Sequence, residues 1–376
     1  MLAAAKAHYL QVIFSILCLL VAAGLFIYFF EQLPVEGTTL GIDWLGLWSE
    51  FQGGTIHYMI TDGLRNPPWS VLPIIPLGFF SPRASWGLLS LATIIVFVVS
   101  VPRIRRKRLY WLSVLLLIVS YPSLRHLVDG NFEALVTGGI LLAMYGYDRR
   151  QPYFLAAGIL LATAKPQAIV LFMVVLGLYI LQTWPPRLWI KAALAVLVIV
   201  IPTMLWRGSD WIQAVQGTYQ SGSIIDISLT AALTRTGWFA PGIIVSVWLL
   251  LIAATLYIAW KSDRKLSREK AGMLVAASLL AAPYAAGNSM ITIMAIGVIP
   301  LFQKRPLLGG VLIALINFLF LWNKDLLYNY SAYYLTGVML ACWAVLGWWV
   351  LKGAAHQQPH AVLLEKPENV LPSKMG

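Results

Sequence analysis

Asp43 is the residue whose type and surroundings best suit acid–base chemistry in this chain. It lies in the long segment 31–70, which separates the first apolar stretch from the next. Between Ile42 and Gln52 the apolar residues recur at helical spacing: Trp44, Leu47, Trp48 and Phe51. The pattern predicts a helix in the membrane interface, with its aromatics in the headgroups and its acids toward protein or water. A carboxylate held there can accept a proton from a hydroxyl at the lipid surface; the alternative is a solvated loop acid.

Lys165 is the first of three cations that could bind an anionic group. It follows the small-residue run LAAGILLATA and precedes Pro166, at or near membrane depth, where a charge is costly. There it can bind a phosphate as a point charge, or its long side chain can reach the interface and serve no such role.

Arg125 and Arg235 are the other two cations. Arg125 opens the segment RHLVDGNFE, in which a tight turn is expected at residues 129–131. A purely structural turn is the alternative reading of this segment. Arg235 ends SLTAALTR just before an apolar stretch, where it could meet an anionic headgroup.

The composition is that of an integral membrane protein. Sixty per cent of the residues are hydrophobic and only 11% are charged, against about a quarter charged in soluble domains. Uncharged apolar segments of membrane-crossing length recur along the chain. They cover residues 10–30, 84–102, 109–125, 132–147, 152–164, 167–182, 188–206, 237–260, 271–284, 286–302, 306–322 and 331–351.

These segments predict an all-α polytopic bundle of about ten to twelve transmembrane helices. The pattern makes residues 1–352 a single transmembrane domain, followed by a polar tail, 353–376, without fixed structure. Segment 66–86, with prolines at 67, 68, 73, 76 and 82, cannot be an ordinary straight span. It is either a re-entrant or interfacial segment, or the proline-kinked start of the second span.

The net charge of +12 has the distribution that orients membrane proteins. The basic residues cluster in short stretches between apolar segments, at 103–108, 148–150, 261–270 and 303–305. With the N-terminus in the cytoplasm, most of the 27 lysines and arginines fall on the cytoplasmic side. We therefore expect both termini in the cytoplasm of a bacterial-type plasma membrane protein, the long first loop and the candidate site outside, and no nucleic-acid partner.

Several kinds of chemistry are not indicated. There is no GxxxxGK[ST] loop for a nucleotide, no HExxH, no clustered His and Cys, no Asp-x-Asp and no GxSxG. Cys18 and Cys342 lie within apolar segments, where packing is the expected role. No metal and no cofactor are expected. Charges in the middle of the apolar segments are rare, which disfavours a proton-coupled transporter.

The order of the motifs resembles the polyprenyl-phosphate-sugar-dependent glycosyltransferases of the GT-C superfamily. The closest resemblance is to glycosyltransferase family 87, the bacterial alpha-mannosyltransferase-like proteins, from about Asp43 to Pro300. The matching stretches are GIDW, NPPWSVLPIIPLGFF, DGNFE, LAAGILLATAKPQA, DISLTAALTR and LLAAPYAAGN. The family's turn usually reads Gly-Gln-x-Asn where this chain has Gly130-Asn131-Phe132-Glu133. Its later motif is usually Ser-Pro with an aromatic and often a His, where this chain has Ala282-Pro283-Tyr284 and Asn288.

The resemblance implies transfer of a hexose, such as mannose, from a polyprenyl-phosphate donor to a lipid or glycan hydroxyl on the outer face. It makes Asp43 the general base of an inverting reaction. Lys165, Arg235 and Arg125 would stabilise the departing phosphate. The polar residues expected to bind the acceptor or the sugar are Glu50, Asp62, Asn66, Asn131 and Asn288.

Two other functions remain open from the sequence. A transporter or flippase of lipid-linked sugars predicts polar residues along the middle of the bundle. A non-catalytic envelope-glycan assembly protein does not require Asp43, Lys165 and Arg235 to converge.

Overall fold

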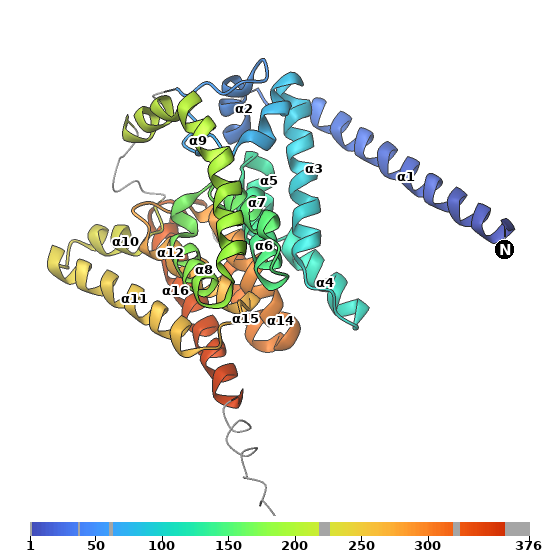
Figure 1. Cartoon of the computed structure of the whole chain (residues 1–376). Helices are drawn as coiled ribbons and strands as arrows, with labels where there is room; N and C mark the ends of the chain where they lie inside the picture. Colours follow the sequence, from blue (N-terminus) through green and yellow to red (C-terminus); the bar gives the residue numbers. More distant parts are fainter. Residues whose placement is uncertain (1, 37, 60–62, 218–225, 319–323, 358–376) are drawn as a thin grey trace, which may run out of the picture.

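A computed structural model describes residues 2–36, 38–59, 63–217, 226–318 and 324–357 (Figure 1). All of the regular secondary structure in the described residues is helical, which confirms the predicted all-α fold class. Its longer helices are α1 (Leu2–Glu31), α3 (Pro82–Ser100), α4 (Lys107–Ile118), α6 (Glu133–Asp148), α7 (Pro152–Ala162), α8 (Val170–Thr183), α9 (Pro186–Gly217), α11 (Pro241–Lys261), α12 (Arg268–Ala281), α15 (Pro306–Asn317) and α16 (Lys324–Gln357). Its shorter elements are α2 (Ile42–Trp48), η1 (Ser49–Phe51), η2 (Leu72–Phe79), α5 (Tyr121–Asp129), η3 (Pro166–Ala168), α10 (Leu229–Thr236), η4 (Gly287–Ser289), α13 (Met290–Ile293), η5 (Met294–Val298) and α14 (Ile299–Lys304).

Each predicted apolar segment corresponds to a helix or a run of helices. By length and composition, five of the described helices can cross a membrane, or six if α4 and α5, bent by 51°, form one span. Helices α7, α8 and α15 are also apolar but shorter. α16 continues past residue 352 to Gln357, and the remainder of the expected tail lies outside the described residues.

The core of the bundle is built around α12, which is buried along nearly its whole length. Here backbones lie very close: a Cβ on Gly272 would come within 2.5 Å of the Gly297 Cα in η5. By contrast, α1 is largely exposed between Val12 and Leu25 and projects from the bundle in Figure 1. It meets the bundle at its C-terminal end, where the Phe30 and Trp86 rings lie 4.7 Å apart.

Helices α6 and α7 form an antiparallel hairpin held by glycines. A Cβ on Gly139 would lie 2.3 Å from the Ala162 nitrogen, and one on Gly158 would lie 2.2 Å from the Ala143 nitrogen. Small residues at such positions let two helix backbones approach closely inside a membrane protein. Because the hairpin turns back on itself, the start of α6 and the end of α7 lie at the same end of the bundle.

The first loop carries a small aromatic core of its own. The rings of Trp44 and Phe51 are fully buried and stack 5.8 Å apart, and both meet Phe132 edge-on. The predicted helix is confirmed as α2 and η1, but its predicted placement of these aromatics in the headgroups is wrong. They pack on protein instead, since Trp44 donates through its indole nitrogen to the Ser85 hydroxyl at 2.8 Å.

The proline-rich segment forms an element separate from the span that follows. η2 ends at Phe79, and the chain is extended at Phe80 and Ser81 before α3 begins at Pro82. The Ser81 hydroxyl caps α3 by accepting from the Ala84 nitrogen at 3.1 Å. Of the two predicted alternatives, the structure therefore has the separate segment rather than a kinked start of the span.

The turns that carry the basic clusters gather at one end of the bundle. Arg268 donates to the Ser100 carbonyl at 3.2 Å, and Lys304 lies 2.6 Å from the Glu269 carboxylate. The Tyr147 hydroxyl donates to the Arg264 carbonyl at 3.1 Å. These turns lie at the lower end of the bundle in Figure 1, away from α2 and the first loop.

Candidate active site

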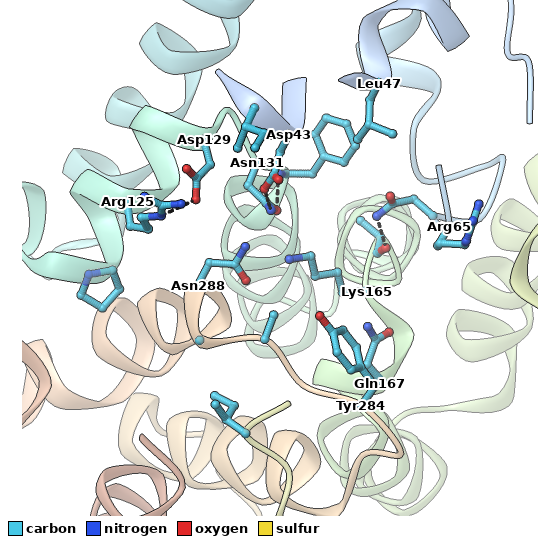
Figure 2. A pocket seen from close by; sticks show the side chains of 18 of the residues that line it. Asp43, Leu47, Arg65, Arg125, Asp129, Asn131, Lys165, Gln167, Tyr284 and Asn288 are labelled. Carbon is cyan, nitrogen blue, oxygen red and sulfur yellow. Dashed lines mark hydrogen bonds and ion pairs between the residues drawn. The ribbon is translucent and has the colours of Figure 1, made fainter. Parts of the chain in front are cut away.

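A pocket of about 710 Å³ opens between the first loop and the upper ends of the bundle helices (Figure 2). Its walls come from stretches far apart in the chain: residues 42–47 and 63–66 of the first loop, α5 with the turn after it, the segment after α7, and the segment before η4. Ile227 and two residues of α16, Ala332 and Leu335, complete it on an apolar side. The pocket thus has a polar wall and an apolar wall.

Asp43 lines this pocket from the first turn of α2. Its carboxylate is half-buried, and Asn131 donates its side-chain amide to Asp43 Oδ2 at 2.8 Å. Asn131 is held in turn, because its Oδ1 accepts from the Phe132 nitrogen at 2.7 Å. The carboxylate is therefore oriented by an amide that leaves its charge in place.

Gly130 is what lets α2 and α5 meet at the site. It ends α5 with a left-handed φ of 75°, and a Cβ there would lie 2.5 Å from the Trp44 Cβ. Nearby, the Gly41 nitrogen donates to the Val128 carbonyl at 2.6 Å. The turn predicted at residues 129–131 is confirmed, and it places Asn131 beside Asp43.

Lys165 lines the pocket from the segment between α7 and η3. Its side chain is 15% exposed, and its ammonium lies 2.7 Å from Glu133 Oε2 at the start of α6. Figure 2 shows the ammonium pointing into the space between Asn288 and Asp43. The α6–α7 hairpin brings together these two charges, which the sequence separates by two helices.

Arg125 reaches the same pocket from α5 as part of an ion pair. Its Nε lies 2.8 Å from Asp129 Oδ2, and it is about half exposed while Asp129 is buried. Both residues line the cavity. Of the two acids that line the pocket, Asp129 is thus ion-paired, whereas among the described residues the side chain of Asp43 bonds to an amide.

Another part of the pocket lining is the segment before η4, which a buried carboxylate fixes in place. Asp226 Oδ1 accepts from the nitrogens of Ser228 and Ala285 at 2.9 and 3.0 Å. This joins the chain before α10 to the chain after α12. It sets Tyr284 into the pocket, where burial first, then the charges of Asp226 and Asp43, raise the pKa of its hydroxyl. Tyr284 is therefore a protonated hydrogen-bond donor at neutral pH.

Two expected ligand-binding residues also line the pocket. Asn66 donates to the Ala164 carbonyl at 2.6 Å, which ties the first loop to the segment that carries Lys165. Asn288 lies opposite, and its buried side-chain oxygen has no hydrogen-bond partner among the described residues. Figure 2 shows this side chain turned toward the centre of the cavity.

Two of the predicted site residues, Arg235 and Glu50, do not line the pocket. Arg235 points elsewhere: it donates to the Asp226 carbonyl and lies over the Tyr333 ring at 5.5 Å. Glu50 is fully buried beneath the loop, where it accepts from the Leu64 nitrogen at 2.8 Å, and it does not line the pocket. Asp62 lies outside the described residues.

Four residues of this site were not among the predicted site residues: Glu133, Gln167, Asp226 and Tyr284. Each lies within a motif that was recognised, and Glu133 and Asp226 act through partners distant in the sequence. Asp226, for example, opens the recognised stretch DISLTAALTR but bonds to the stretch LLAAPYAAGN. Among the described residues, no group of three or more His, Cys, Asp or Glu side chains is close enough to hold a metal ion.

Comparison with known proteins agrees with the motif pattern. The family model of glycosyltransferase family 87 matches residues 65–283, more than half of the chain. The match covers Arg125, Asn131 and Lys165 and begins after Asp43. No curated protein and no solved structure is significantly similar to the chain. With its apolar helical bundle and this match, the chain belongs to glycosyltransferase family 87 and is a membrane glycosyltransferase.

Proposed function

We propose that the protein transfers a hexose, mannose in the first instance, from a polyprenyl-phosphate donor to a hydroxyl of a lipid or glycan. The observation that carries the proposal is the pairing pattern in the pocket. Asp43 is held by an amide and stays free of a salt bridge among the described residues, and it lines the same pocket as Lys165 and Arg125. Such a pocket can hold a base and two cations around one ligand.

Asp43 acts as the general base. It takes the proton of the acceptor hydroxyl as the hydroxyl oxygen bonds to the anomeric carbon. The bond from that carbon to the phosphate oxygen breaks on the opposite face, and its electron pair leaves with polyprenyl phosphate. The reaction therefore inverts the anomeric configuration.

Lys165 and Arg125 stabilise the phosphate as it gains charge. Each already has a carboxylate partner, which fixes its position before the donor arrives. Arg235 has no part in this proposal because its guanidinium lies outside the pocket.

Asn131, Asn288 and Asn66 supply amides for the sugar and acceptor hydroxyls, and Tyr284 supplies a donor. The apolar wall made by Ile227, Ala332 and Leu335 suits the first isoprene units of the donor. A lipid-linked donor and a lipid-exposed bundle bring the reactants together in the plane of the membrane.

The active site faces the outside of a bacterial-type plasma membrane, with both termini in the cytoplasm. The support for this orientation is the gathering of the basic turns at the end of the bundle away from the first loop.

The test is transfer of labelled mannose from mannosyl polyprenyl phosphate to endogenous lipids in membranes. Wild type is compared with Asp43→Asn at equal expression, and Glu36→Gln, an exposed acid of the same loop, is the matched control. We expect product with wild type and with Glu36→Gln, and a loss of about 10²- to 10⁴-fold with Asp43→Asn. Full transfer by Asp43→Asn would remove the general base from the proposal. Absence of transfer by wild type from both mannosyl and glucosyl donors would favour a transporter of lipid-linked sugars.

A further inference from the structure

Glu133 is a buried carboxylate directly behind the pocket wall, and the chemistry proposed above uses it only to fix the position of Lys165. Its side chain has no exposed surface. One oxygen, Oε2, lies 2.7 Å from the Lys165 ammonium. The other, Oε1, accepts from the Thr292 hydroxyl at 3.1 Å, and that hydroxyl lies 3.0 Å from the hydroxyl of Thr137.

Packing alone does not require a charged side chain at Glu133. A buried carboxylate is costly unless a cation and hydrogen bonds compensate it. The neighbouring hydroxyls of Thr137 and Thr292 can satisfy each other, and a glutamine would fill the same space. Among the described residues the ion pair of Glu133 is with Lys165. The charge of the Glu133 carboxylate therefore matters through its effect on Lys165.

The Lys165 ammonium can interact both with Glu133 and with a ligand in the pocket. An ammonium has three N–H donors. The Lys165 ammonium lies 2.7 Å from Glu133 Oε2 as an ion pair, and because Lys165 is partly exposed in the pocket it keeps N–H groups for a ligand there. A phosphate bound by Lys165 would therefore share its cation with a carboxylate that is already in place.

We propose that Glu133 is a positioning residue that holds the Lys165 ammonium at the wall and weakens its grip on the departing phosphate. This inference rests on the proposed function, since it needs polyprenyl phosphate as the leaving group. In a pocket partly screened from water, an unshared ammonium would bind the product dianion strongly. Tight product binding slows turnover when release limits the rate. The negative charge of Glu133 offsets part of the charge of the same ammonium, and it therefore favours release of polyprenyl phosphate.

The decisive variant is Glu133→Gln. It keeps the volume and an oxygen that can accept from Lys165, and it removes the charge. Polyprenyl phosphate should then inhibit transfer at roughly tenfold lower concentration than in wild type. The donor KM should fall in the same direction, and kcat should fall as product release slows. A residue with a merely structural role would weaken product binding rather than strengthen it.

Two controls isolate the charge. Thr292→Val removes the bond to Glu133 Oε1 and keeps the carboxylate, so the inhibition constant should stay near the wild-type value. In a Lys165→Met background, Glu133→Gln should have no further effect on inhibition, because the ammonium through which it acts is absent.

An inhibition constant that is unchanged or higher in Glu133→Gln would overturn the inference. If that variant does not fold, Glu133→Asp keeps the charge and withdraws it from the ammonium, and it should show a smaller tightening of inhibition in the same direction. Equal or weaker inhibition in Glu133→Asp would also count against the role. A wild-type protein that neither transfers sugar nor responds to polyprenyl phosphate would instead overturn the proposed function itself.

Discussion

Asp43 owes its place in the pocket to a short chain of neighbours. The Asn131 amide orients the carboxylate, and the Phe132 nitrogen orients the Asn131 side chain in turn. An oriented base needs no rearrangement when the acceptor hydroxyl arrives. The family's usual turn has glutamine where this chain has Asn131, and here the shorter amide still reaches the carboxylate.

Asn131→Ala should therefore lower the rate without abolishing binding. The Asp43 carboxylate keeps its charge but loses its anchor, and a misplacement of about 1 Å can cost up to a hundredfold in rate. We expect kcat for sugar transfer to fall by roughly ten- to a hundredfold with little change in the donor KM. Asn131→Gln is the matched variant, since it restores an amide and should recover part of the loss. A fall in donor affinity alone would assign Asn131 to the donor instead.

At the residue scale the sequence located part of the site. Asp43, Asn66, Arg125, Asn131, Lys165 and Asn288 all line one pocket. Asp43, Arg125 and Lys165 were singled out by residue type and position, and the three asparagines by the family resemblance. Arg235 and Glu50 have the same types and similar positions, yet they point away from the cavity. The direction of a side chain depends on contacts distant in the sequence, which composition and spacing do not contain.

The α6–α7 hairpin is the element that sets the distance between Glu133 and Lys165. Its two backbones touch at glycines, so the helices cannot slide or separate without losing that contact. The hairpin therefore fixes the position of the Lys165 ammonium in the pocket.

Gly158→Val should disrupt this hairpin. Its side chain would need the space occupied by the Ala143 backbone, 2.2 Å away, so the helices must part. We expect a loss of several degrees in melting temperature of the purified protein, and a loss of transfer activity because Lys165 moves. The matched control is Gly177→Ala in α8, where a Cβ meets nothing within 4 Å. Equal stability of Gly158→Val and wild type would show that the hairpin can relax.

The first loop holds a buried acid whose titration can be followed. Glu50 accepts a bond from the Leu64 nitrogen, but burial is the largest influence on it and raises the pKa of its carboxyl above the ordinary 4.5. Burial thus disfavours the charged form in the folded state. The resulting loss of stability is absent below the unfolded-state pKa and grows as the pH rises through the folded-state pKa.

Glu50→Gln should therefore stabilise the protein at neutral pH relative to acid pH. Glutamine keeps the oxygen that accepts from Leu64 and carries no charge. We expect the difference in melting temperature, variant minus wild type, to increase as the pH is raised from 4 to 7. Glu36→Gln, at an exposed position, should show no such trend. A difference that shrinks with pH would mean that nearby Arg65 outweighs the cost of burial.

At the element scale, the sequence predicted where the helices form better than it predicted what packs against them. Every predicted apolar segment is helical because runs of this composition have few other options in a membrane. The helix at Ile42 was also predicted, but its buried aromatics Trp44 and Phe51 meet Phe132 rather than lipid. A periodic apolar face shows that something apolar covers it, and does not show whether the cover is lipid or protein.

On the scale of the whole molecule, the basic clusters and the pocket lie at opposite ends of the bundle. The basic turns bond to one another at one end, and the pocket lies at the other. The clusters were visible in the sequence, because they follow the spacing of the apolar segments. Their contacts with one another were not, since these depend on how the helices pack.

Orientation can be tested with single cysteines in a Cys18→Ala, Cys342→Ala background. Ser49→Cys in the first loop and Gln151→Cys in the α6–α7 turn are both at exposed positions. In intact cells, a membrane-impermeant thiol reagent should label the cysteine at 49 and leave the cysteine at 151 unlabelled until the membrane is opened. The reverse pattern would place the pocket on the cytoplasmic side and contradict the proposed orientation.

The pairing of Glu133 with Lys165 also constrains how the protein is made. The ribosome delivers Glu133 at the start of α6 before it delivers Lys165 after α7, so the carboxylate enters the insertion machinery without its cation. A lone charge among apolar helices is costly. A short turn, residues 149–151, joins the two helices and lets them enter the bilayer together. The Glu133 and Lys165 charges can then pair as the helices insert. The same ion pair that serves the pocket thus favours insertion of α6 and α7 as one unit during synthesis.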